Sequence, residues 1–195
     1  MSQRSLLLKA EPSFLGPGAT MVSSGKAVGS WLSEEGSLTR RLRTLCGSSF
    51  RVEVVGAHWR TPFLGEARLL RVRNHRRAWV REVVLFAGDC PLVLARSVIP
   101  RETLRGRHCQ LARLGQRPLG EWLFSHPELR RLSLEFARVQ PQQWCPELKA
   151  AQGLGVPVWG RRALYDVARH QLLVCEFFLP QLLRLDNHTQ GSECD

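Results

Sequence analysis

Two long apolar runs separated by a short polar segment constrain the fold of this chain more than any other feature. Residues 78–87 and 92–99 are rich in valine, leucine and other side chains that favour strands, and Gly-Asp-Cys-Pro stands between them at 88–91. Glycine, aspartate and proline are typical turn residues. The pattern therefore predicts a β-hairpin, which ends at Pro100.

A second hairpin and two further strands follow from the same kind of pattern. Residues 162–167 and 171–179 alternate around Ala-Arg-His at 168–170 and form the second predicted hairpin. The β-branched and aromatic segment 51–59 predicts another strand, and 67–73 a short one. About six strands are therefore expected, and hairpin connections make the sheet antiparallel.

Helices are expected between these strands, at 38–45, 102–114, 121–124 and 127–139. Ser37 is a suitable N-cap for the first helix. Ser125 is a suitable N-cap for the last helix, because Pro127 follows in the first turn and Glu128 stands three residues after the serine. The predicted fold class is α+β, with an antiparallel β-sheet of about six strands covered by helices on one side.

The chain of 195 residues suits one domain with extensions. We expect a loosely ordered leader at 1–29, a folded domain at 30–182 with an inserted loop at 140–157, and a mobile tail at 183–195. The sequence leaves open whether translation starts at Met1 or Met21. Lys9 follows three leucines too closely for a signal peptide, and no apolar run is long enough to span a bilayer, so we expect a cytoplasmic protein.

The charge balance is strongly basic, with 28 Lys and Arg against 17 Asp and Glu, a formal net charge of +11. Such a balance suits an anionic partner, which can be a nucleic acid, an acidic lipid surface or a small carboxylate. The basic run RVRNHRR at 71–77 is interpreted as a solvated loop rather than a nucleic-acid site, because no helix or RNA-binding motif surrounds it. Cysteines and histidines lack the spacing of a metal site, so no metal is expected.

Three charged residues interrupt the apolar rows of the predicted strands. Arg81 shares a face with Val83 and Leu85, Glu82 lies on the opposite face of the same strand, and Glu176 lies in the middle of the last strand. A buried charge needs a partner. One interpretation is that the three pair with one another or lie at a solvated edge of the sheet, and the other is a pocket that binds an anion at Arg81 and a hydroxyl or ether oxygen at Glu176.

An ordered series of short motifs resembles the chorismate pyruvate-lyase family of ubiquinone biosynthesis. The motifs are WLSEEGSLTRRL at 31–42, WVREVVL at 79–85, RSVIP at 96–100, LGQRPLGEWLF at 114–124, WGRR at 159–162 and LLVCEFFLP at 172–180. Each motif alone is weak, but together they follow the order of the family and cover about residues 30–182.

The resemblance implies a monomeric enzyme that converts chorismate to 4-hydroxybenzoate and pyruvate without a metal or an organic cofactor, in a buried site closed by helical flaps. Arg81 is expected to bind the ring carboxylate, and Glu176 to face the opposite end of the ring. The backbone N–H groups of Leu38 and Leu119 are expected to bind the ring carboxylate too. Leu38 stands where the family commonly has methionine, which a backbone contact tolerates.

Three alternatives stay open at this point. Glu176 acts either as a protonated general acid or as a group that only positions the substrate. The carboxylate of the substrate's side chain meets Arg161 or Arg162. The rival function is a non-catalytic small-molecule-binding domain of the same fold, similar to the ligand-sensing domains of GntR-type regulators; nucleic-acid binding is not expected.

Overall fold

One antiparallel sheet forms the centre of the computed structural model, which describes residues 4–16, 26–73 and 75–191. Its strands are β1 (Phe50–Arg60), β2 (Ala78–Ala87), β3 (Cys90–Ile99), β4 (Leu129–Val139), β5 (Val158–Val167) and β6 (His170–Phe178). Their order across the sheet is β1-β2-β3-β6-β5-β4. Both predicted hairpins are present, and the pairing of β3 with β6 joins them at the centre.

The turn residues explain where the hairpins reverse direction. Gly88 has a φ of 56° in the turn between β2 and β3. Ala168 and Arg169 have φ values of 51° and 67° between β5 and β6. Two consecutive left-handed residues match the twist of the flanking strands, although side chains make this conformation costly.

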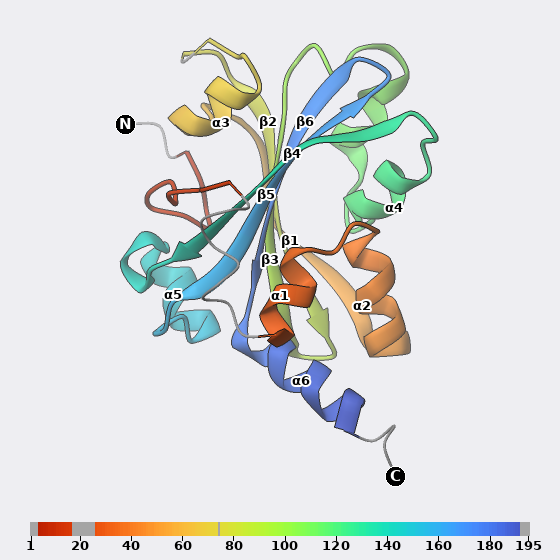
Figure 1. Cartoon of the computed structure of the whole chain (residues 1–195). Coiled ribbons are helices and arrows are strands. Elements are labelled where there is room, and N and C mark those ends of the chain that lie inside the picture. The colour runs from red at the N-terminus through yellow and green to blue at the C-terminus, as the bar shows by residue number, and fades with distance from the viewer. Residues whose placement is uncertain (1–3, 17–25, 74, 192–195) are drawn as a thin grey trace.

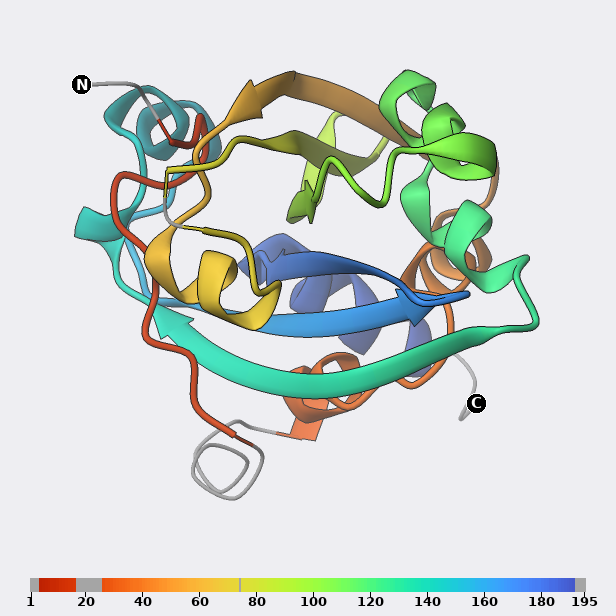
Figure 2. The same ribbon diagram turned by 90° about the horizontal axis from the view of Figure 1, so that it is seen from above.

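Helices cover both faces of the sheet. The α-helices are α1 (Lys26–Leu32), α2 (Leu38–Cys46), α3 (Leu64–Leu69), α4 (Leu119–Phe124), α5 (Pro146–Gln152) and α6 (Pro180–Gly191). The 3₁₀ helices are η2 (Gly47–Ser49), η3 (Gly106–Arg113) and η4 (Pro141–Gln143). One face carries α1, α2, α4 and α6, and the opposite face carries α3, α5 and the N-terminal segment 4–16 (Figures 1 and 2).

The alternation within β2 assigns each side chain to one of two cores. Val83 and Leu85 pack with the helices α1, α2 and α6. Val80 and Val84 pack on the opposite face with the N-terminal segment and α5. Since a strand places neighbouring residues on opposite faces, a nearly continuous apolar run is what a sheet covered on both sides requires.

The predicted strand at 67–73 is wrong, because most of this segment belongs to α3 and the turn after it. Glu66 in the first turn accepts a hydrogen bond from the amide of Phe63 at 2.8 Å. The same carboxylate pairs with the buried Arg96 at 2.7 Å. The helical turn therefore places Glu66 against a cation whose burial would otherwise be costly.

The predicted helix at 127–139 is also wrong, because the segment is the edge strand β4. It pairs with β5 along its length, with one irregularity between Arg131 and Ser133. Leu132, Leu134 and Phe136 alternate with polar residues, which is a strand pattern. The prediction relied on the helix-start signal at Ser125 instead of this alternation. In the structure, pairing with β5 determines the conformation of the segment.

The segments expected to be loose contribute to the core where the structure describes them. In the expected leader, Leu7 and Leu8 are buried, and residues 26–29 belong to α1. The expected loop at 140–157 contains η4 and α5, with Trp144 buried. In the expected tail, α6 continues to Gly191 and Asp186 is buried. Residues 1–3, 17–25 (with Met21) and 192–195 lie outside the described residues.

Candidate active site

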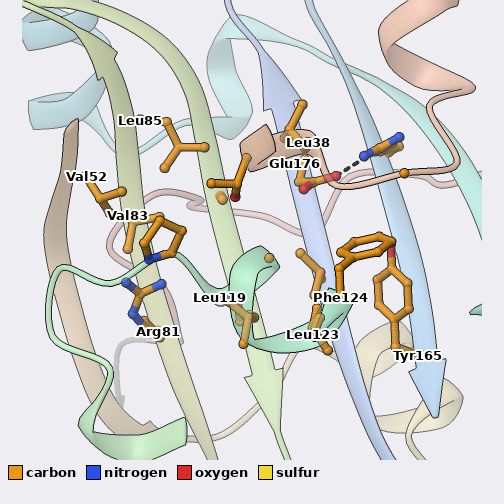
Figure 3. A pocket seen from close by; sticks show the side chains of 18 residues that line it. Leu38, Val52, Arg81, Val83, Leu85, Leu119, Leu123, Phe124, Tyr165 and Glu176 are labelled. Atoms are coloured by element: carbon orange, nitrogen blue, oxygen red, sulfur yellow. Dashed lines mark hydrogen bonds and ion pairs between the residues drawn. The ribbon is translucent and has the colours of Figure 1, made fainter. Parts of the chain in front are cut away.

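A small enclosed cavity lies between one face of the sheet and the helices α2 and α4 (Figure 3). Its lining comprises Gly36, Leu38, Thr39, Val52, Arg81, Val83, Leu85, Ala95, Ser97, Pro118, Leu119, Gly120, Leu123, Phe124, Arg161, Tyr165, Val174 and Glu176. The cavity has a volume of about 50 Å³. An engineered cavity of roughly 150 Å³ is known to bind benzene. A ring-sized ligand therefore requires the cavity to widen.

All four residues singled out in the sequence line this one cavity. Arg81 and Glu176 lie on the same face of the sheet, on strands that are separated by β3. Arg81 is paired with Ser97, whereas Glu176 is paired with Ala95, so the two charges are offset both across and along the sheet. Leu38 and Leu119 belong to the covering helices α2 and α4.

Arg81 is a buried cation without a carboxylate partner in the described part of the chain. Its Nη2 donates hydrogen bonds to the backbone oxygens of Gly115 at 2.9 Å and Arg117 at 3.0 Å. Burial lowers the pKa of the Arg81 guanidinium to about 10. An anionic ligand would restore the charge balance, and the planar guanidinium suits a carboxylate.

Glu176 has a strong partner at the other end of the cavity. Arg161 Nε donates a hydrogen bond to Glu176 Oε2 at 2.6 Å, the contact drawn as a dashed line in Figure 3. Burial lowers the pKa of Arg161, but the charge of Glu176 outweighs this effect and raises it overall. In this arrangement Oε2 of Glu176 is a hydrogen-bond acceptor.

Arg161 and Arg162 differ in the face that they occupy. Arg161 faces the cavity, and its Nη1 also donates to the backbone oxygen of Glu34 at 2.7 Å. Arg162 points to the opposite face, where it pairs with Glu135 and Glu11. Arg162 is therefore too far from the cavity to meet a ligand there, which removes one of the two candidates for the second carboxylate.

Tyr165 is a cavity residue that the sequence analysis missed. Its pKa is raised by burial and by the charge of Glu176, so the hydroxyl keeps its proton and can donate to a ligand. On β4, its cross-strand neighbour is Arg131, which donates to the backbone oxygen of Glu34 at 3.0 Å. The available signal was the period of β5, which places Tyr165 in the same row as Arg161.

The first turns of α2 and α4 bring two amide groups to the cavity. Leu38 follows the N-cap Ser37, whose side chain accepts from the amide of Arg40, and Leu119 follows the N-cap Pro118. The first N–H groups of a helix have no acceptor within the helix. Among the described residues, no other acceptor is found for the amides of Leu38 and Leu119.

The interpretation that Arg81, Glu82 and Glu176 pair with one another is wrong. Glu82 lies on the opposite face and accepts from Arg96 Nη1 at 2.8 Å. It also accepts from the hydroxyl of Ser5 and from the amide of Leu6. This buried network satisfies Glu82 on its own face and leaves Arg81 available to a ligand.

Together, the fold and the cavity define an α+β protein with an enclosed cavity on the sheet, in which a buried arginine lies at one end and a carboxylate at the other. No group of metal-binding side chains occurs among residues 4–16, 26–73 and 75–191. None of the helices described there is long and apolar enough to cross a membrane.

Comparison with known proteins identifies the family. The chain belongs to the chorismate lyase family, whose model matches residues 16–187. A protein of Methylococcus capsulatus named "Probable chorismate pyruvate-lyase" is 51% identical over 79% of this chain and 95% of its own length. A protein of the same name from Pseudomonas aeruginosa is 42% identical over 82% of this chain and 87% of its own.

Solved structures with similar folds are distant in sequence. A GntR-family transcriptional regulator from Bacillus cereus aligns with a TM-score of 0.53 at 9% identity, over 68% of this chain and 93% of its own. The effector domain of PhnF from Mycobacterium smegmatis aligns with a TM-score of 0.51 at 15% identity, over 74% of this chain and 89% of its own. At such identities the likeness concerns the fold alone, and it agrees with the six-stranded antiparallel sheet.

Proposed function

We propose that the protein is a chorismate pyruvate-lyase, which converts chorismate to 4-hydroxybenzoate and pyruvate. The observation that carries the proposal is the buried, carboxylate-free Arg81 in a cavity of a chorismate lyase family member. Arg81 binds the ring carboxylate, together with the amides of Leu38 and Leu119. Glu176 accepts a hydrogen bond from the ring hydroxyl at the opposite end.

The reaction divides a dianion into two stable products. The bond between the ring and the ether oxygen breaks, and pyruvate departs with that oxygen, while the ring hydroxyl is retained. The hydrogen on the hydroxyl-bearing ring carbon passes to the methylene carbon of the side chain, which becomes the methyl group of pyruvate. The transfer is internal to the substrate, so the enzyme mainly has to hold the reactive conformer.

In this scheme Glu176 positions the ring rather than supplying a proton, since Arg161 holds it as an acceptor at 2.6 Å. The carboxylate of the substrate's side chain binds beside Tyr165 and Arg131. Tyr165 keeps its hydroxyl proton, and Arg131 is the cationic residue across from it on β4. Arg161 contributes indirectly, because its Nε already donates to Glu176 and its Nη1 to backbone oxygens.

The test is to incubate the purified protein with chorismate and to follow 4-hydroxybenzoate and pyruvate together. Equimolar release of both is expected, and the variant Arg81→Gln should serve as the control for background decay of chorismate. Well-folded protein that binds chorismate or 4-hydroxybenzoate but releases no product would favour the non-catalytic binding domain instead.

We propose further that the enzyme acts as a cytoplasmic monomer, does not bind nucleic acid and supplies 4-hydroxybenzoate for ubiquinone synthesis. Light scattering coupled to size exclusion tests the oligomeric state. A mutant lacking the gene should lose ubiquinone and recover it when 4-hydroxybenzoate is supplied.

A further inference from the structure

The four arginines of the basic run at 71–77 belong to a second site, which shares no lining residue with the cavity. An open groove of about 900 Å³ lies where β2 begins and the β5–β6 hairpin turns, the end at the top of Figure 1. Residues from three parts of the sequence that lie far apart form it, at 70–73 with 76–77, at 100–103 with 105, and at 169–171, together with Trp59. Its arginines are Arg71, Arg73, Arg76, Arg77, Arg101, Arg105 and Arg169.

These groove arginines are exposed and lack carboxylate partners. In the described part of the chain, no carboxylate lies within 4 Å of any of their guanidinium groups, and Glu102 is the one acidic residue of the lining. By contrast, the buried Arg96 and Arg162 each pair with two carboxylates. Several positive charges without nearby negative charges in a concave site attract anions and raise their local concentration.

The shape of the site selects the kind of anion. The arginines come from three segments that face a common hollow, so a compact, multiply charged ligand can contact several of them at once. A flat bilayer contacts the rim of a groove but not its floor. Guanidinium groups bind phosphate oxygens through paired hydrogen bonds. The ring of Trp59, with Arg101 at 5.3 Å from its centroid, offers an additional planar surface.

We propose that this groove, which we call the arginine groove, binds a small polyphosphate anion, such as a nucleoside triphosphate or inorganic polyphosphate. The proposal does not depend on the chorismate reaction, because the arginine groove and the cavity have no lining residue in common.

Calorimetric titration of the full chain with ATP and, separately, with inorganic tripolyphosphate at physiological ionic strength tests the proposal. The double variant Arg76→Glu/Arg101→Glu changes two of the three segments and should weaken binding at least tenfold. The matched control is Arg138→Glu/Arg184→Glu, which changes the net charge equally at exposed sites on β4 and α6 and should stay within twofold of wild type.

Equal affinity for both anions supports recognition of the phosphates alone, and tighter binding of ATP supports an added contact of the base with Trp59. The proposal is overturned if the wild type binds neither anion, or if the control variant loses as much affinity as the groove variant. It is also overturned if a single-stranded oligonucleotide or vesicles of phosphatidylglycerol bind while both small anions do not. Thermal melting of both variants checks that they are folded.

Discussion

Arg81 and Glu82 are consecutive residues of β2, and their side chains lie on opposite faces of the sheet in opposite electrostatic situations. Glu82 is paired with Arg96, whereas Arg81 donates only to the backbone oxygens of Gly115 and Arg117. Because a strand alternates its faces, a pairing between the two neighbours is excluded. One strand thus contributes to a closed ionic network on one side and, on the other, presents to the cavity a cation without a carboxylate partner among the described residues.

Replacing Arg81 by glutamine should lower kcat/KM for chorismate by about 10- to 150-fold, because a hydrogen bond to a charged group contributes roughly 1.5–3 kcal/mol. Steady-state kinetics with coupled detection of pyruvate measures the effect. The exposed Arg184 on α6 provides a matched control, and Arg184→Gln should keep the activity of the wild type. An Arg81→Gln enzyme with unchanged kcat/KM would remove Arg81 from the proposed site.

The affinity of the site for carboxylates should fall as the pH rises through about 10, the pKa to which burial lowers Arg81. The protonated guanidinium is the form that binds an anion. Binding is therefore constant below this pH, and above it the Kd rises about tenfold per unit of pH. Titration with benzoate measures this, since benzoate has no second titrating group. Arg81→Gln should bind weakly at every pH, and a wild-type Kd that stays constant up to about pH 11 would contradict the prediction.

Glutamine in place of Glu176 should raise KM and lower kcat by less than about tenfold, since the amide oxygen can still accept from the ring hydroxyl. A general acid typically contributes 10²–10⁴-fold to the rate. A fall in kcat of about 1000-fold would therefore favour a proton-donating Glu176. Arg161 loses its counter-charge in this variant, so we also expect the free energy of unfolding to fall by about 1–3 kcal/mol, less than for a fully buried pair.

Glu135→Gln is the matched control for that loss of stability. Glu135 pairs with Arg162 at 2.7 Å on the opposite face of the sheet, as Glu176 pairs with Arg161 beside the cavity. The control should lower the free energy of unfolding in urea titrations by a smaller amount, because Arg162 keeps its pair with Glu11 at 3.0 Å, and it should leave kcat/KM unchanged. A comparable fall in activity would show that loss of stability, rather than loss of the acceptor, explains the effect of Glu176→Gln.

Gly120 sets how closely α4 approaches α2 over the cavity. A Cβ at this position would lie 2.7 Å from Thr39 Oγ1 and 3.4 Å from Ser37 Oγ. Gly120→Val should therefore push the two helices apart, displace the amide of Leu119 and raise KM more than it lowers kcat. The control is Gly155→Val, since a Cβ at Gly155 meets no atom within 4 Å. Equal KM values for both variants would contradict a role of this close approach.

The sequence predicted the residues that line the cavity better than it predicted the elements that cover the sheet. Arg81 and Glu176 stand out because each breaks the apolar row of a strand, and the resemblance added the helix-start residues Leu38 and Leu119. The number of strands was right, but β4 was taken for a helix and α3 for a strand. Both errors fall on short or edge elements, where pairing and burial outweigh local propensity.

The second covered face could not be predicted, because its packing depends on contacts across long stretches of sequence. Leu7 packs in a core with residues of β2 and β6, and Ser5 donates to Glu82. Glycines, prolines and serines in the first 27 residues hide this role, since no helix or strand period is visible there. The arginine groove could not be predicted for the same reason. In the sequence 71–77 looks like an isolated charged loop, and only the fold brings residues of 101–105 and Arg169 beside its arginines.

Removing residues 1–20 should destabilise the protein by about 3–6 kcal/mol, because it uncovers the face of the sheet that carries Glu82 and Arg96. The truncated chain loses the buried side chains of Leu7 and Leu8 and two of the donors to Glu82. A lower urea midpoint is expected, with a higher rate of proteolysis. A truncated chain that unfolds at the same urea concentration as the wild type would contradict the packing described for this segment.

Two point variants separate the contribution of packing from that of chain length. Leu7 is fully buried, whereas Leu15 is 52% exposed in the same N-terminal segment. Leu7→Ala should lower the free energy of unfolding by about 2–4 kcal/mol, as expected for a deleted core side chain. Leu15→Ala should change it by less than about 0.5 kcal/mol. Similar losses in both variants would mean that the segment stabilises the domain through its backbone pairing with β4 and Trp144, rather than through buried leucines.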